Sequence, residues 1–89
     1  MTKWTWYVYI IECQDKSYYT GLTWDLSTRF EQHSGGLGSK YTTKHGFKKL
    51  AYYEEHNDLE VARTREVQIK KWTRKKKENL IKGLWSQEW

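Results

Sequence analysis

Residues 4–13 read Trp-Thr-Trp-Tyr-Val-Tyr-Ile-Ile-Glu-Cys, and nearly every position is apolar or aromatic. Successive side chains of a β-strand point to opposite faces. Even-numbered positions from Trp6 to Ile10 would therefore cover one face, and odd-numbered positions from Tyr7 to Ile11 would cover the other. This stretch is far shorter than the roughly 18 apolar residues that a membrane span needs. It predicts a strand that is covered on both sides.

Two more stretches have the composition of strands. Polar turn-forming residues occupy positions 14–17, and β-type composition resumes over residues 18–23, so residues 4–13 and 18–23 are predicted to form a hairpin. Residues 48–55 alternate weakly between polar and apolar side chains and form the predicted third strand.

Helices are predicted from residues that can cap them. Asp25 can cap a short helix over about residues 26–33. Asn57, followed three residues later by Glu60, resembles a capping box for a second helix that runs to about residue 72. Thr73 would cap a third helix. The glycine-rich, polar stretch from residue 35 to 46 is predicted to be a long loop of the kind that carries binding residues.

The resulting order ββαβαα predicts an α+β fold, with a small three-stranded antiparallel sheet flanked by about three helices. Eighty-nine residues allow one domain, with a core over about residues 4–82 and a tail over residues 83–89. The tail would either dock through its apolar side chains or fray. One cysteine cannot form an internal disulfide, and no leader is apparent, so we expect a soluble, cytoplasmic protein.

The net charge of +5 is concentrated in residues 63–82, which hold nine basic and two acidic side chains. Such a basic segment is typical of polyanion binding, because each neutralised phosphate releases condensed counterions. It is equally typical of a solvated helix face. Charge alone leaves both interpretations open.

Glu66 interrupts an apolar stripe on the second predicted helix. Leu59, Ala62 and Ile69 follow helical spacing, and position 66 completes it with a carboxylate. An inward carboxylate must be protonated, paired or bound to a cation, because burying it alone is costly. The alternative is an ion pair on the same helix, with Arg63, Arg65 or Lys70.

One pair on the first predicted helix has the chemistry of a phosphate site. Arg29 and His33 are four residues apart, so a helix places a permanent cation and a titratable imidazole on one face. Arginine offers a fork of donors that matches phosphate oxygens, although the same spacing occurs on ordinary surface helices. Tyr9 and Tyr19 lie on the two hairpin strands, where core packing is the expected role of each phenol, with a partner needed for each buried hydroxyl.

Two tripeptides and three single residues follow one another along the chain: Tyr7-Val8-Tyr9, Tyr19-Thr20-Gly21, Arg29, His33 and Glu66. In this order and approximate spacing they resemble the GIY-YIG nuclease superfamily, over residues 4 to about 82. The chain most resembles the small stand-alone members, which are similar to the amino-terminal nuclease domain of the repair protein UvrC.

The chain departs from the family pattern at several positions. Tyr7 stands in place of the first glycine, and Thr20 in place of the central isoleucine of the second tripeptide. Leu22 follows that tripeptide, and residues 21–25 contain no lysine, where some members keep a basic group. These departures remove one activator of the tyrosine.

The resemblance implies an endonuclease that hydrolyses phosphodiester bonds in DNA. It assigns one divalent ion, Mg²⁺ or Mn²⁺, to Glu66, and a hard cation of this kind keeps several waters, so one carboxylate suffices. It assigns the base to Tyr9 or Tyr19, and the stabilisation of transition-state charge to Arg29. His33 would contact the phosphate or shuttle a proton.

Substrate contacts would come from the predicted loop and from the basic segment. The candidates are Lys40, Tyr41, Lys44, Lys70, Lys71, Arg74 and Lys75. Sequence preference would then come from nucleic acid shape or from a partner protein. One alternative function is a nucleic-acid-binding module with little or no turnover, and another is protein interaction through the tail tryptophans.

Overall fold

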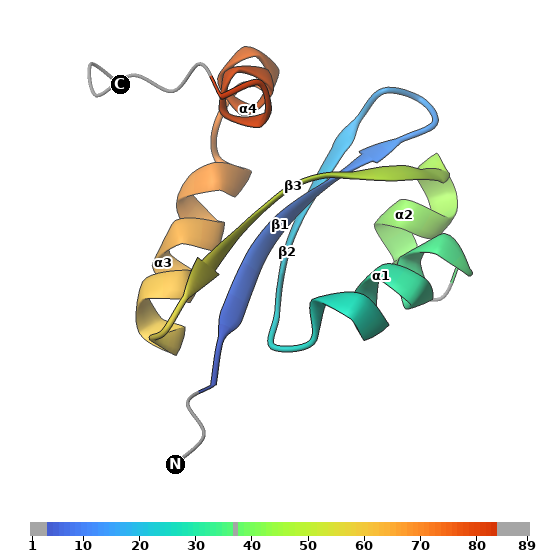
Figure 1. Cartoon of the computed structure of the whole chain (residues 1–89). Helices are drawn as coiled ribbons and strands as arrows, with labels where there is room; N and C mark the ends of the chain where they lie inside the picture. Colours follow the sequence, from blue (N-terminus) through green and yellow to red (C-terminus); the bar gives the residue numbers. More distant parts are fainter. Residues whose placement is uncertain (1–3, 37, 84–89) are drawn as a thin grey trace.

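The structure is a computed structural model that describes residues 4–36 and 38–83. It contains one three-stranded antiparallel sheet in the order β2-β1-β3 (Figure 1). The strands are β1 (Trp6–Cys13), β2 (Tyr18–Thr23) and β3 (Phe47–His56). The helices are α1 (Leu26–Ser34), α2 (Lys40–His45), α3 (Leu59–Lys70) and α4 (Arg74–Ile81). The predicted α+β class, the antiparallel sheet and the hairpin are confirmed.

β1 is the central strand, and apolar clusters lie on both of its faces, as its composition predicts. Val8 and Ile10 pack with Ala62 and Ile69 on the face that α3 covers. Tyr9 packs with neighbouring apolar side chains of β1 in a separate cluster on the opposite face. Figure 1 shows α3 and α4 on one side of the sheet and α1 and α2 on the other. None of the helices within the described residues is long and apolar enough to cross a bilayer.

The prediction of a continuous loop over residues 35–46 is wrong, because Lys40–His45 forms α2. The fold therefore has four helices in the order ββααβαα. Ser39 begins α2 through its side-chain oxygen, which accepts a hydrogen bond from the Thr42 amide at 3.1 Å. The helix has only 6 residues, and these show no apolar periodicity. The sequence alone therefore does not predict it.

The boundaries of α3 also differ from the predicted ones. Asp58, rather than Asn57, caps the helix by accepting hydrogen bonds from the amides of residues 60 and 61. The helix ends at Lys70, two residues before the predicted limit. Thr73 caps α4 as predicted. The predicted docking residues of the tail, Leu84, Trp85 and Trp89, lie outside the described residues.

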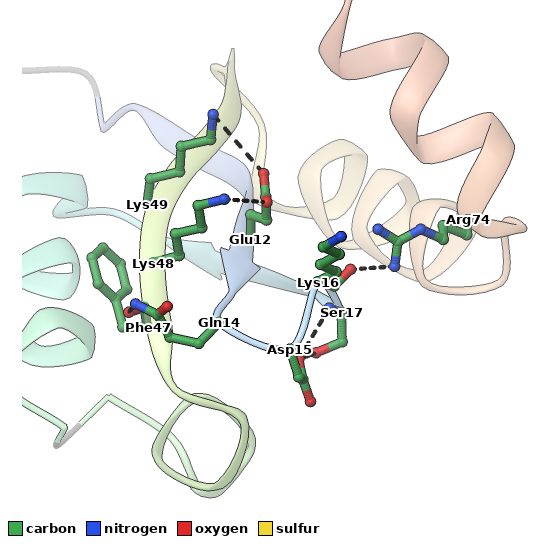
Figure 2. A network of polar contacts seen from close by, with 9 residues as sticks. All are labelled: Glu12, Gln14, Asp15, Lys16, Ser17, Phe47, Lys48, Lys49 and Arg74. Atoms are coloured by element: carbon green, nitrogen blue, oxygen red, sulfur yellow. Dashed lines mark hydrogen bonds and ion pairs between the residues drawn. The ribbon is translucent and has the colours of Figure 1, made fainter.

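The turn of the β1–β2 hairpin is tied to two other elements (Figure 2). The Gln14 side chain donates a hydrogen bond to the Phe47 carbonyl on β3 at 3.0 Å. The Arg74 guanidinium at the start of α4 donates to the Lys16 carbonyl. It also lies over the Tyr18 ring, 4.9 Å from its centroid. These contacts fix the basic helix α4 against the hairpin.

One buried hydroxyl on β2 has no hydrogen-bond partner within the described part of the chain. Thr20 is 3% exposed, and its Oγ1 is unpaired there. Since burial of an unpaired hydroxyl is unfavourable, we expect Thr20→Val to raise the free energy of unfolding by about 1 kcal/mol in urea denaturation.

Thr23→Val is the matched control, because the Thr23 hydroxyl is also buried but is hydrogen bonded. It donates to the Asp25 carbonyl and accepts from the Asp25 amide. We expect this second change to lower stability. A loss of stability in Thr20→Val would mean that the Thr20 hydroxyl has a partner in solution.

Candidate active site

A line of three hydrogen-bonded side chains joins β1 to α1 and α2. The Tyr9 hydroxyl lies 2.9 Å from Nε2 of His33, and Nδ1 of His33 lies 2.8 Å from Oγ1 of Thr42. All three residues are buried, and His33 is completely inaccessible. The imidazole therefore has both of its nitrogens occupied, one by a phenol and one by an alcohol.

Tyr19 and Tyr41 extend this cluster. The Tyr19 ring lies 5.3 Å from the His33 ring and 6.3 Å from the Tyr9 ring, measured between centroids. Tyr41 of α2 packs on Tyr19 at 5.6 Å. The two strand tyrosines of the predicted site and the predicted histidine are thus brought together in one aromatic cluster.

Two glycines allow the close packing of this cluster. Gly21 lies opposite Tyr9 in the strand register, and a methyl group at this position would overlap the Tyr9 phenol. Gly38 lies against the His33 imidazole in the same way. Gly21 therefore serves a close approach of side chain to backbone rather than a turn.

We expect Gly21→Ala to displace the Tyr9 ring, because the added methyl group meets both the ring and its hydroxyl. Overpacking of this kind typically costs about 1–3 kcal/mol of unfolding free energy. The loss should be visible in urea denaturation. Gly35→Ala is a milder control, since its methyl group would make one tight contact, at 3.3 Å from the Glu31 carbonyl, and would not overlap a ring. Equal stability of the two variants would contradict the packing seen at Tyr9.

Burial and neighbouring charges alter the titration of the tyrosine and the histidine. Burial is the largest cause that raises the pKa of Tyr9, and Tyr19 and the Glu66 carboxylate raise it further, while the Arg29 guanidinium opposes them. Burial also lowers the pKa of His33, and the positive charge of Arg29 lowers it again. At neutral pH the phenol is therefore protonated and the imidazole is neutral.

Arg29 is close to this cluster on α1. Its Nη1 donates a long hydrogen bond to the Gly38 carbonyl at 3.4 Å. Its charge acts on both Tyr9 and His33. A guanidinium fixed beside a phenol and a neutral imidazole is suited to binding an anion such as a phosphodiester.

Glu66 is both largely buried and paired with a lysine of its own helix, the two arrangements predicted from the sequence. Its side chain is only 18% exposed, and it forms an ion pair with Lys70 of the next turn at 3.2 Å. The Lys70 side chain is 52% exposed, so the pair is open to solvent. The charge of the carboxylate also makes the smallest contribution to the raised pKa of Tyr9.

A lightly held hard cation would need few protein ligands beside Glu66. Within residues 4–36 and 38–83, no three His, Cys, Asp or Glu side chains are arranged to hold a metal together. One solvent-accessible carboxylate leaves coordination positions for waters and phosphate oxygens, which suits Mg²⁺ better than a metal that needs a full protein cage.

The remaining predicted contact residues fall on two separate surfaces. Lys40 and Lys44 of α2 are exposed and border a hollow of about 550 Å³. Lys71 is exposed directly after α3, and Lys75 is exposed on α4. Arg74 instead has its guanidinium on the hairpin turn, where it also pairs with Glu78. Cations of the α3–α4 segment also cover an indole ring, since Arg65 and Lys76 lie over Trp72.

Two contributors to the site were not predicted from the sequence. Thr42 contacts the buried nitrogen of His33, and Gly38 packs on its ring. Both lie in residues 35–46, the stretch predicted to be a loop. A spacing of nine residues between His33 and Thr42 matches no helical or strand period, so no sequence signal connects them.

Comparison with known proteins places these residues in a family. The model of the GIY-YIG catalytic domain matches residues 5–79. The UPF0213 protein CPE1444 of Clostridium perfringens is 47% identical over 75 residues, which cover 84% of this chain and 81% of that protein. The UPF0213 protein HQ_3675A of Haloquadratum walsbyi is 43% identical over 74 residues, which cover 83% of each chain.

A solved structure supports the same assignment. The solution NMR structure of the UPF0213 protein BH0048 from Bacillus halodurans matches with a TM-score of 0.57 and 40% identity. The match covers 88% of this chain and 83% of that one. GIY-YIG nucleases generally use divalent metals. The chain belongs to the nuclease-like GIY-YIG family, among its small stand-alone UPF0213 members.

Proposed function

We propose that the chain is a metal-dependent endonuclease that hydrolyses phosphodiester bonds in DNA. The observation that carries this proposal is the hydrogen bond between the Tyr9 hydroxyl and His33 Nε2. The charges of Arg29 and Glu66 also act on the pKa of this phenol. His33 and Arg29 of α1 and Glu66 of α3 thus act on the hydroxyl group of one tyrosine of β1. Such convergence of titratable groups is typical of a catalytic site.

In this proposal Tyr9 is the general base, and His33 accepts the proton that Tyr9 gives up. A protonated phenol can take a proton from water only if it gives up its own. If His33 Nδ1 donates to Thr42 Oγ1, then Nε2 is free to accept the proton of Tyr9. The water proton then moves to the Tyr9 oxygen while the Tyr9 proton moves to His33.

In the same mechanism, Arg29 binds the negatively charged phosphate and Glu66 binds the cation. The Arg29 guanidinium binds a non-bridging phosphate oxygen, where negative charge grows in the transition state. The Glu66 carboxylate would hold one Mg²⁺ or Mn²⁺. When bound, such an ion polarises a phosphate oxygen and lowers the pKa of a bound water. Lys70, which pairs with Glu66 at 3.2 Å, would have to release the carboxylate.

The test is nicking of supercoiled plasmid DNA by the purified chain. We expect nicking with Mg²⁺ or Mn²⁺, none with EDTA, and recovery when the metal is restored. Nicking that continues in EDTA would contradict the metal requirement. Absence of nicking under all metal conditions, with the DNA bound, would contradict the endonuclease.

The second candidate is a binding module with the nuclease fold and little turnover. It is favoured by Leu22, which offers no basic group beside the tyrosines, and by the basic surface of residues 70–77. A module of this kind would bind DNA with a steep salt dependence, and Glu66→Ala would leave binding intact. The same plasmid assay separates the candidates, because the module binds without cutting.

A further inference from the structure

Trp24 is a large apolar side chain that remains in solvent beside the candidate active site. It follows β2 directly and precedes Asp25, the cap of α1, and it is 54% exposed. Trp4 is 62% exposed and meets it edge to face, with ring centroids 5.2 Å apart and planes at 88°. Paired exposed indoles are uncommon on a surface that binds nothing.

A small hollow connects Trp24 to the candidate site. It has a volume of about 160 Å³, and its lining includes Trp24, Thr28, Arg29 and Gln32. Arg29 therefore belongs both to this hollow and to the group of side chains around Tyr9. A group bound to the Arg29 guanidinium would therefore lie next to a group that packs on the Trp24 indole.

The chemistry of the hollow fits a nucleobase better than a second phosphate. Asp25 also lines it, so the positive charge of Arg29 is opposed there by a carboxylate. That carboxylate accepts hydrogen bonds from the Thr28 amide and hydroxyl. An indole supplies a flat apolar face, and the Gln32 amide and the hydroxyl groups can meet the polar edge of a neutral ring.

We propose that Trp24 stacks on an unpaired base next to the phosphodiester that Arg29 holds. The chain would then prefer nucleic acid with an unpaired nucleotide at the cut over a perfect duplex. In a duplex, neighbouring bases cover both faces of each base, so an indole can stack only on a base that has left the helix. This inference rests on the proposed function, which places the scissile phosphate at Arg29.

The experiment compares two DNA duplexes of the same sequence, one fully paired and one with a single unpaired nucleotide. Binding of the full chain to each is followed by fluorescence anisotropy at low salt in EDTA, so that cleavage plays no part. We expect Trp24→Leu to weaken binding of the unpaired substrate by about 5-fold to 100-fold and to leave binding of the paired duplex unchanged. Trp24→Phe keeps an aromatic face and should retain most of the preference.

Val61→Ala is the matched control. Val61 is 53% exposed, about as much as Trp24, but it lies on α3 and lines neither this hollow nor the larger one that Trp24 shares with Tyr53. This change should alter binding of neither substrate. If Trp24→Leu does not fold, quenching of 2-aminopurine at the unpaired position by the wild-type chain supports the stack, and unchanged fluorescence overturns it.

Two negative results have different meanings. If the wild-type chain binds DNA but Trp24→Leu weakens both substrates equally, or neither, then the stacking inference is overturned and the nuclease proposal stands. If the wild-type chain binds neither substrate at low salt, the nuclease proposal itself fails. In that case Trp4 and Trp24 would be left as a surface for a protein partner.

Discussion

Glu66→Gln is expected to reduce metal-dependent DNA nicking by about 10³-fold or more, since a bound metal ion supplies several kcal/mol of transition-state stabilisation. The substitution keeps the shape of the side chain and removes only the charge that is proposed to hold the cation. The Lys70 side of the ion pair is 52% exposed, so loss of the pair should cost little stability. The measurement is the single-turnover nicking rate with Mg²⁺, together with a urea denaturation curve.

Glu60→Gln is the matched control for this change. Glu60 lies on the same helix, is exposed, and belongs to its first turn. It should nick at the wild-type rate. Equal rates for both variants would exclude Glu66 as the metal ligand, and equal nicking by a mock preparation would identify a contaminant.

Arg29→Ala is expected to lower the rate of the cleavage step by about 10²-fold to 10³-fold, the usual cost of removing one group that stabilises transition-state charge. Arg29→Lys should recover only part of this rate, because a lysine keeps the charge but not the planar fork of donors. The rates should be measured in single turnover at saturating DNA, so that weaker binding does not contribute.

Arg63→Ala makes the same change in net charge on the exposed surface of α3. It should lower affinity slightly at low salt and leave the rate at saturation unchanged. If Arg29→Ala behaves like Arg63→Ala, then Arg29 contributes to general DNA attraction and not to the chemical step.

The sheet was readily predicted from the sequence because its signals are local. The continuous apolar run of β1 and the polar turn after it define the hairpin, and β2 has the predicted limits. Capping residues located α1 and α4. For α3 the capping chemistry was recognised one residue too early, since Asn57 and Asp58 offer the same side-chain acceptor.

The site was only partly accessible from the sequence. Glu66 stood out because a carboxylate interrupted an apolar stripe, and that signal is local. The bond from His33 to Thr42 depends instead on how α1 and α2 pack together, and the packing of Gly21 on Tyr9 depends on strand register. Such contacts arise from tertiary structure, and no periodicity in one sequence records them.

The proposed cation ligand and the proposed phosphate ligand stand on helices that cover opposite faces of one sheet. Glu66 belongs to α3, which packs through Ala62 and Ile69, whereas Arg29 belongs to α1 on the side of Tyr9. The gap between the two side chains is therefore set by the depth of the β-layer and by two independent cores. A methyl group added or removed at Ala62 or Ile69 would therefore change the distance between the two proposed ligands without touching either of them.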